Sequence, residues 1–134
     1  DKSSAFLHGH SYSGNPIACA AANATLGLIE RENMLEKVAA MTAIYMQWVP
    51  RFEEIYGTFN IRARGGIFAF ELNSPGADYL GPAGHRVAAR VLEENLYIRP
   101  LGNTVYLMPP YCVDDDELNW AMETLWQATL AEQT

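Results

Sequence analysis

The chain has 134 residues, enough for one domain with a single hydrophobic core, and its 49% hydrophobic and 19% charged residues are typical of a soluble globular protein. The formal net charge of -7 and the scattering of nine basic residues argue against a nucleic-acid-binding surface, and the apolar runs are too short to cross a bilayer. Cys19 and Cys112 lack CxxC spacing, so we expect two buried thiols in a reduced, cytoplasmic protein and no disulfide framework.

Residues 7–16, LHGHSYSGNP, gather small hydrogen-bond donors directly before a predicted helix. Donors at a helix N-terminus suit an anion such as phosphate, and a purely structural loop is the alternative. His8 and His10 could present two imidazoles on one face of an extended strand, but no carboxylate or cysteine lies near enough in the sequence to complete a metal site, so we expect no metal. A Ser-His-Asp hydrolase is disfavoured because the chain has no GxSxG motif.

Two helices are predicted next. Asn15 and Pro16 are typical of a helix start and open an alanine-rich helix that ends near Arg31, which we expect to be packed on several sides. Asn33 and Glu36 have capping-box spacing and predict the start of a second helix. That helix should kink or restart at Pro50. Its predicted core positions, spaced at helical intervals, are Leu35, Val38, Met41, Tyr45, Trp48 and Phe52.

A period of two replaces the helical spacing in residues 59–72, which predict two strands, or one strand broken by a bulge, around Gly65 and Gly66. Residues 73–82 read as a loop. A third helix follows in residues 83–96, with an inward face expected at Val87, Val91 and Leu92.

Residues 97–111 predict two short strands joined through Pro100, Gly102 and Asn103. Three aspartates at 114–116 then open a last helix, where we expect them to cap the helix rather than bind a metal. The element order predicts an α+β fold with helices layered on a mostly antiparallel sheet. Residues 1–32 are assigned to a loop and connecting helix, and residues 33–134 to a small α+β domain.

The segment HGHSYSGNPIACAAANATLGLIE resembles a stretch of the class III, fold-type I pyridoxal phosphate aminotransferases. In that family the stretch reads H-G-x-T-[YF]-x-G-N-P and continues into an alanine-rich helix. RARGGIFAFEL is similar to a strand and glycine turn of the family, and YIRPLGNTVYLMPPY resembles the C-terminal signature of its biotin-pathway branch. The resemblance covers essentially the whole chain, in the family's order.

The resemblance implies roles for five residues. Ser11 stands where the family has a threonine that reaches into the neighbouring subunit's active site and hydrogen-bonds the phosphate of pyridoxal 5'-phosphate. Gly9 and His10 are expected to line the same shared site, although the family has a proline or another small residue in place of His10. Arg99 is expected to bind the substrate carboxylate and Tyr106 to lie nearby. By pattern alone, a surface ion pair and a core position are the alternatives for these last two residues.

The implied activity is transfer of an amino group from S-adenosylmethionine to 8-amino-7-oxononanoate by a homodimer. Neither Lys2 nor Lys37 matches the family's Schiff-base lysine, so we expect that lysine to precede residue 1. We therefore interpret the chain as a C-terminal portion that is inactive alone and contributes no catalytic residue. Another class III aminotransferase acting on an ω-amino acid, and a non-catalytic binding module of the same fold, are the alternatives.

Overall fold

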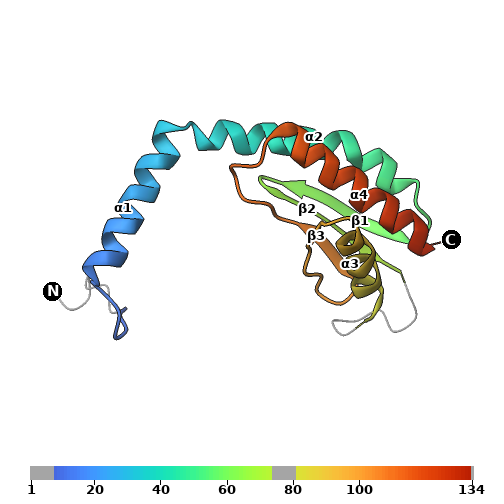
Figure 1. The fold of residues 1–134 in the computed structure, drawn as a ribbon, viewed down its shortest axis with the longest axis horizontal. Helices are drawn as coiled ribbons and strands as arrows, with labels where there is room; N and C mark the ends of the chain where they lie inside the picture. Colours follow the sequence, from blue (N-terminus) through green and yellow to red (C-terminus); the bar gives the residue numbers. More distant parts are fainter. Residues whose placement is uncertain (1–7, 74–80, 134) are drawn as a thin grey trace. The chain divides into compact units, whose positions relative to one another are not determined.

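A computed structural model describes residues 8–73 and 81–133 of the chain (Figure 1). The chain divides into two compact units, Asp1–Met34 and Leu35–Thr134. Most of the segment predicted as a loop at residues 73–82 lies outside the described residues. Among the described residues, no helix is both long and apolar enough to span a membrane.

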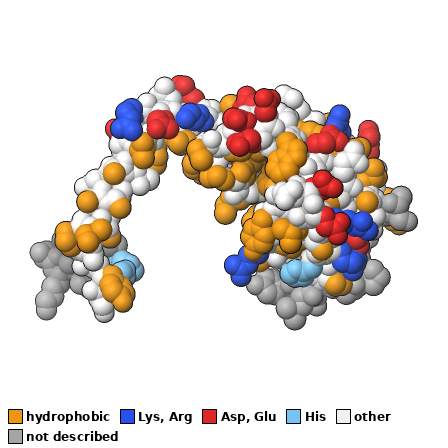
Figure 2. Space-filling model, in the orientation of Figure 1, with side chains coloured by type: hydrophobic (Ala, Val, Ile, Leu, Met, Phe, Trp, Pro, Cys, Tyr) orange, Lys and Arg blue, Asp and Glu red, His pale blue; other side chains and the backbone are white. Residues whose placement is uncertain are grey.

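The described part of the first unit contains a turn followed by helix α1 (Pro16–Arg31), and the helix has the bounds that the sequence predicts. The Asn15 side chain accepts hydrogen bonds from the N–H groups of Ile17 and Ala18, at 3.0 and 3.1 Å, and so caps the helix. The expected packing of α1 is wrong within this chain, because the helix has no buried residue. Its apolar side chains lie exposed along the helix (Figure 2).

Helix α2 (Met34–Glu53) runs through Pro50 without restarting, and Met41, Tyr45, Trp48 and Phe52 are buried as predicted. Leu35, by contrast, is exposed. The expected capping box is also wrong, because Asn33 has a φ of 49°, outside the extended backbone region of an N-cap residue. Its N–H instead donates to the Glu30 carbonyl at the end of α1.

The sheet has three antiparallel strands in the order β1-β2-β3: β1 (Thr58–Arg64), β2 (Ile67–Leu72) and β3 (Thr104–Leu107). The two-strand prediction for residues 59–72 is confirmed, with Gly65 at a φ of 59° in the turn and a register shift between Phe59 and Arg62. The strand predicted before Gly102 is absent. Leu101 turns back to bridge Thr104, and Pro100 has no N–H to donate to a neighbouring strand.

The core lies on one face of this sheet. Phe68, Phe70 and Leu72 are alternate residues of β2, so their side chains point to that face. The centroid of the Phe52 ring of α2 lies 4.9 Å from that of Phe68 and 5.0 Å from that of Phe70. The hydroxyl of the neighbouring Tyr45 donates to the Gly66 carbonyl at 3.2 Å, and burial raises its pKa to about 12.

Two further helices complete the second unit, and α3 (Ala83–Glu93) packs against α4 (Asp115–Gln133) and β3. Val87 and Val91 of α3 are buried as predicted, but Leu92 is 56% exposed. Successive residues of a helix are rotated by about 100° around its axis, so the Leu92 side chain points away from the face that Val91 buries. The prediction of two buried thiols is also wrong, since Cys19 and Cys112 are both free and exposed.

The predicted cap of α4 is confirmed. The Asp114 carboxylate accepts the Glu117 N–H at 2.8 Å, and the Glu117 carboxylate accepts the Asp114 N–H at 3.2 Å. These two reciprocal bonds form a capping box.

Candidate functional site

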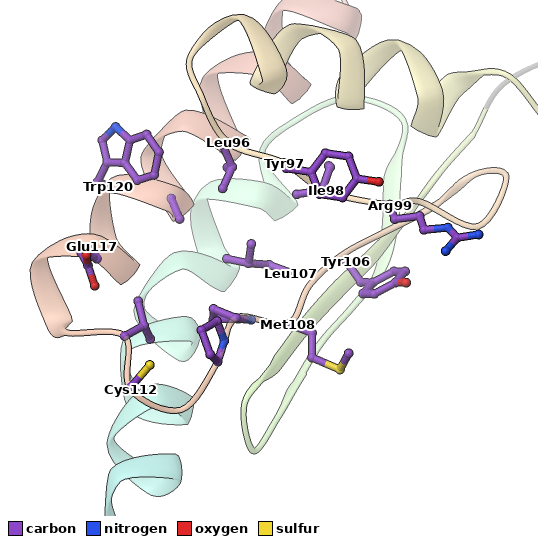
Figure 3. A pocket seen from close by; sticks show the side chains of 14 residues that line it. Leu96, Tyr97, Ile98, Arg99, Tyr106, Leu107, Met108, Cys112, Glu117 and Trp120 are labelled. Atoms are coloured by element: carbon purple, nitrogen blue, oxygen red, sulfur yellow. The ribbon is translucent and has the colours of Figure 1, made fainter.

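The second unit contains a groove of about 630 Å³ between the segment that follows α3, strand β3 and the start of α4. Two residues singled out from the sequence, Arg99 and Tyr106, line it. Figure 3 shows their side chains at one end of the groove, pointing in the same general direction, with Glu117 and Trp120 at the other end.

Arg99 reaches the groove because residues 96–100 are extended and alternate in burial. Leu96, Ile98 and Pro100 are buried, whereas Tyr97 and Arg99 face outward. Arg51, Arg62 and Arg86 each pair with a glutamate, but the Arg99 guanidinium makes no ion pair or hydrogen bond within the part of the chain that the structure describes. Its donors are therefore available to an external anion.

Tyr106 reaches the groove from β3, where it pairs with Ala69 of β2 and is half-buried. Thr104 and Tyr106 alternate with the buried Val105 and Leu107, so the Tyr106 phenol lies on the side of the strand away from the core. The turn at residues 101–104 folds the chain back and brings this phenol to the end of the groove where Arg99 lies (Figure 3).

The rest of the groove is mainly apolar, with Leu96, Met108, Pro109 and Trp120 among its lining residues. A groove with a cationic group at one end and apolar side chains along its length suits a molecule in which a carboxylate is joined to a hydrocarbon chain. The sequence analysis named only Arg99 and Tyr106 among the residues that line the groove, and Tyr97 and Trp120 are two large aromatic lining residues that it did not identify. The apolar-polar alternation of residues 96–100 contained a signal for Tyr97, which is two positions before Arg99. Trp120 carried no such signal.

The turn before α1 in the first unit contains Gly9, His10 and Ser11, and hydrogen bonds within the turn already use several of its N–H groups. The His10 N–H donates to the Ser13 hydroxyl at 2.9 Å, and the Tyr12 N–H donates to His10 Nδ1 at 3.3 Å. Ser11 makes no hydrogen bond with the described residues.

A phosphate at this turn could bind only to hydrogen-bond donors that are not already paired within the chain. The Asn15 side chain already takes the N–H groups of Ile17 and Ala18 at the start of α1. An anion here therefore depends on the uncommitted Ser11 hydroxyl more than on these two amides. The residues present fit one phosphate oxygen at Ser11. Among the described residues, an added Cβ at Gly9 would meet only the Ser13 hydroxyl, at an ordinary 3.7 Å, so contacts with these residues do not require glycine there.

His8 and His10 do not complete a metal site among the described residues, where no group of three or more His, Cys, Asp or Glu side chains could hold an ion. His10 Nδ1 accepts a hydrogen bond, so a neutral imidazole has its proton on Nε2 and can donate there.

The chain belongs to the class-III aminotransferase family, whose model matches residues 2–129. It is similar to the adenosylmethionine-8-amino-7-oxononanoate aminotransferase of Helicobacter pylori, with 38% identity over 130 residues, which are 93% of this chain and 29% of that protein.

Solved structures agree on the fold. The same enzyme from Methanocaldococcus jannaschii has a TM-score of 0.83 at 31% identity, covering 98% of this chain and 31% of its own. A PLP-bound amine transaminase from an uncultivated Pseudomonas species has a TM-score of 0.81 at 30% identity. The match covers 96% of this chain and 30% of the transaminase chain. The chain thus spans less than a third of the length of these relatives.

Proposed function

We propose that this chain is the C-terminal part of a pyridoxal phosphate-dependent aminotransferase of biotin synthesis. The enzyme would transfer an amino group from S-adenosylmethionine to 8-amino-7-oxononanoate, as a homodimer with shared active sites. Similarity to relatives of that name supports the assignment. The observation that carries it is the uncommitted Arg99 guanidinium at one end of an apolar groove.

In this proposal Arg99 binds the carboxylate of the oxononanoate. A guanidinium offers parallel N–H donors that match both oxygens of a planar carboxylate, and an ammonium does not. The apolar lining residues Leu96 and Met108 would take part of the hydrocarbon chain, while the Tyr106 hydroxyl would donate to a polar group of the substrate. These contacts orient the substrate and leave the reacting ketone remote from Arg99.

The first unit would serve the cofactor. When bound, pyridoxal phosphate supplies the electron sink for amino transfer. The Ser11 hydroxyl would donate to its phosphate, and Gly9 and His10 would border the substrate. Lys37 is exposed on α2, and Lys2 lies outside the described residues. We propose that the lysine for covalent attachment of the cofactor belongs to the part of the protein that this chain does not cover.

Substitution of Arg99 in the full-length enzyme tests this function. Arg99→Ala should lower kcat/KM for 8-amino-7-oxononanoate by about 10- to 100-fold, because a charge-assisted hydrogen bond contributes about 1.5 to 3 kcal/mol. Arg99→Lys should recover only part of that loss. The methyl ester, which has no carboxylate, should be aminated equally by all variants, and the absorbance of the bound cofactor should not change.

Arg64→Ala is the matched control, because Arg64 is an exposed arginine that does not line the groove. Equal losses for acid and ester would make Arg99 a structural residue. Activity of the wild-type enzyme on ω-amino acids but not on the oxononanoate would favour the other class III aminotransferases, a reading that the similarity to the amine transaminase keeps open. Absence of any amino transfer would favour a binding module.

A further inference from the structure

We infer that Gly84 is a positioning residue for Arg99, an inference that rests on the proposed function. Gly84 is buried in the first turn of α3, where the helix meets the turn that follows Arg99. A Cβ at Gly84 would lie 2.2 Å from the carbonyl oxygen of Gly102 and 2.8 Å from Cβ of Pro100. Real Cβ atoms do not approach other atoms this closely, so only glycine lets α3 and this turn come together.

The turn is held on its other side and cannot move away freely. Leu101 and Thr104 exchange two backbone hydrogen bonds, both 2.9 Å long. The Leu72 N–H donates to the Asn103 carbonyl, and the Asn103 side-chain amide donates to the Leu72 carbonyl, both at 3.0 Å. Asn103 is buried, so these bonds to the end of β2 are shielded from water.

This anchored turn separates the two polar residues of the groove. Arg99 directly precedes Pro100, one of the two residues that a Cβ at Gly84 would displace. Tyr106 lies beyond the turn, in β3, where its pairing with Ala69 fixes its position. A shift of residues 100–102 therefore moves Arg99 relative to Tyr106, and misplacement of a binding group by 1 Å can cost about 100-fold in rate.

The test compares acid and ester substrates in the full-length enzyme. Gly84→Ala should lower kcat/KM for 8-amino-7-oxononanoate by roughly 10- to 100-fold, mainly through KM, and leave the methyl ester unchanged. In the Arg99→Ala background, Gly84→Ala should have no further effect on the acid, because the group it positions is gone. Ala89→Gly, at an exposed site on α3, is the matched control for weakening the helix and should spare both substrates.

Should Gly84→Ala fail to fold, Asn103→Ala releases the turn from β2 and should give the same selective loss for the acid. Equal losses for acid and ester, or additive losses with Arg99→Ala, would show that Gly84 serves packing alone and would overturn the inference. If Arg99→Ala lowers activity on the acid and Gly84→Ala does not, only the positioning role fails. If Arg99→Ala leaves the acid unaffected, the proposed function fails with it.

Discussion

Ser11 and Ser13 lie two residues apart in the same turn, yet only the Ser13 hydroxyl is held by a hydrogen bond within the turn. The Ser13 oxygen accepts the His10 N–H at 2.9 Å and closes the turn together with the backbone bond from Ser13 to His10. Ser11 has no such bond among the described residues. Ser11 is therefore the serine whose hydroxyl no contact within the turn orients, and the proposed phosphate contact at Ser11 can be tested separately from the order of the turn.

Ser11→Ala in the full-length enzyme should weaken the affinity for pyridoxal phosphate by about 10- to 100-fold, the loss of one charge-assisted hydrogen bond. Ser11→Thr keeps the hydroxyl and should bind the cofactor almost as wild type. Equilibrium dialysis of the cofactor measures both. Ser13→Ala is the control for the order of the turn, because it removes the bond from the His10 N–H but leaves the Ser11 hydroxyl in place. It therefore separates a direct contact of Ser11 with the phosphate from an effect of a looser turn. An equal loss in Ser11→Ala and Ser13→Ala would remove Ser11 from the site.

The start of α4 shows how a local sequence signal forms a structure. The acidic run at 114–116 was predicted as a cap, and Asp114 and Glu117 form the two bonds of a capping box. The cap also orders one end of the groove, because Glu117 and Val113 line it. The helix start therefore contributes to both stability and the shape of the site.

Asp114→Ala should lower the free energy of unfolding by about 1 kcal/mol, because the Glu117 N–H loses its acceptor. Asp114→Asn should be nearly neutral, since asparagine caps helices as well as aspartate does. Denaturant-induced unfolding of the chain measures both. If the two variants lose the same free energy, the charge of Asp114 stabilises α4 through the helix dipole and the capping bond contributes little.

All the buried residues in the described part of the molecule belong to the second unit. The hydrophobic core runs from Met41 to Ala128, whereas α1 has no buried residue. We propose that residues 33–134 form an independently folding domain and that residues 1–32 form a separate loop and connecting helix. A helix of 16 residues with no tertiary packing is marginal in water.

A chain of residues 33–134 should therefore unfold in one cooperative transition, at the same midpoint temperature as the 134-residue chain. Circular dichroism at increasing temperature measures both midpoints. Residues 8–32 alone should show little helix in the same experiment. A clearly lower midpoint for residues 33–134 would mean that α1 stabilises the domain, contrary to the proposal.

Most of the local elements could be predicted from the sequence, because capping, helical spacing and alternation depend on residues a few positions apart. Asn15 starts α1, the two glycines at 65 and 66 separate β1 from β2, and Asp114 caps α4. The family motifs also lie within short segments, so Ser11, Arg99 and Tyr106 could be singled out from the sequence.

Contacts between residues far apart in the sequence could not be predicted from local patterns and appear only in the folded chain. The first of the two short strands predicted within residues 97–111 does not form, because Pro100 has no N–H to donate and Leu101 returns onto Thr104. Gly84 belongs to no motif in the sequence. The need for glycine there appears only in the fold, where α3 meets Gly102, 18 positions later in the chain. Such contacts join residues distant in sequence, and local patterns do not encode the space between them. Close packing therefore determined where Arg99 lies and which groove it borders.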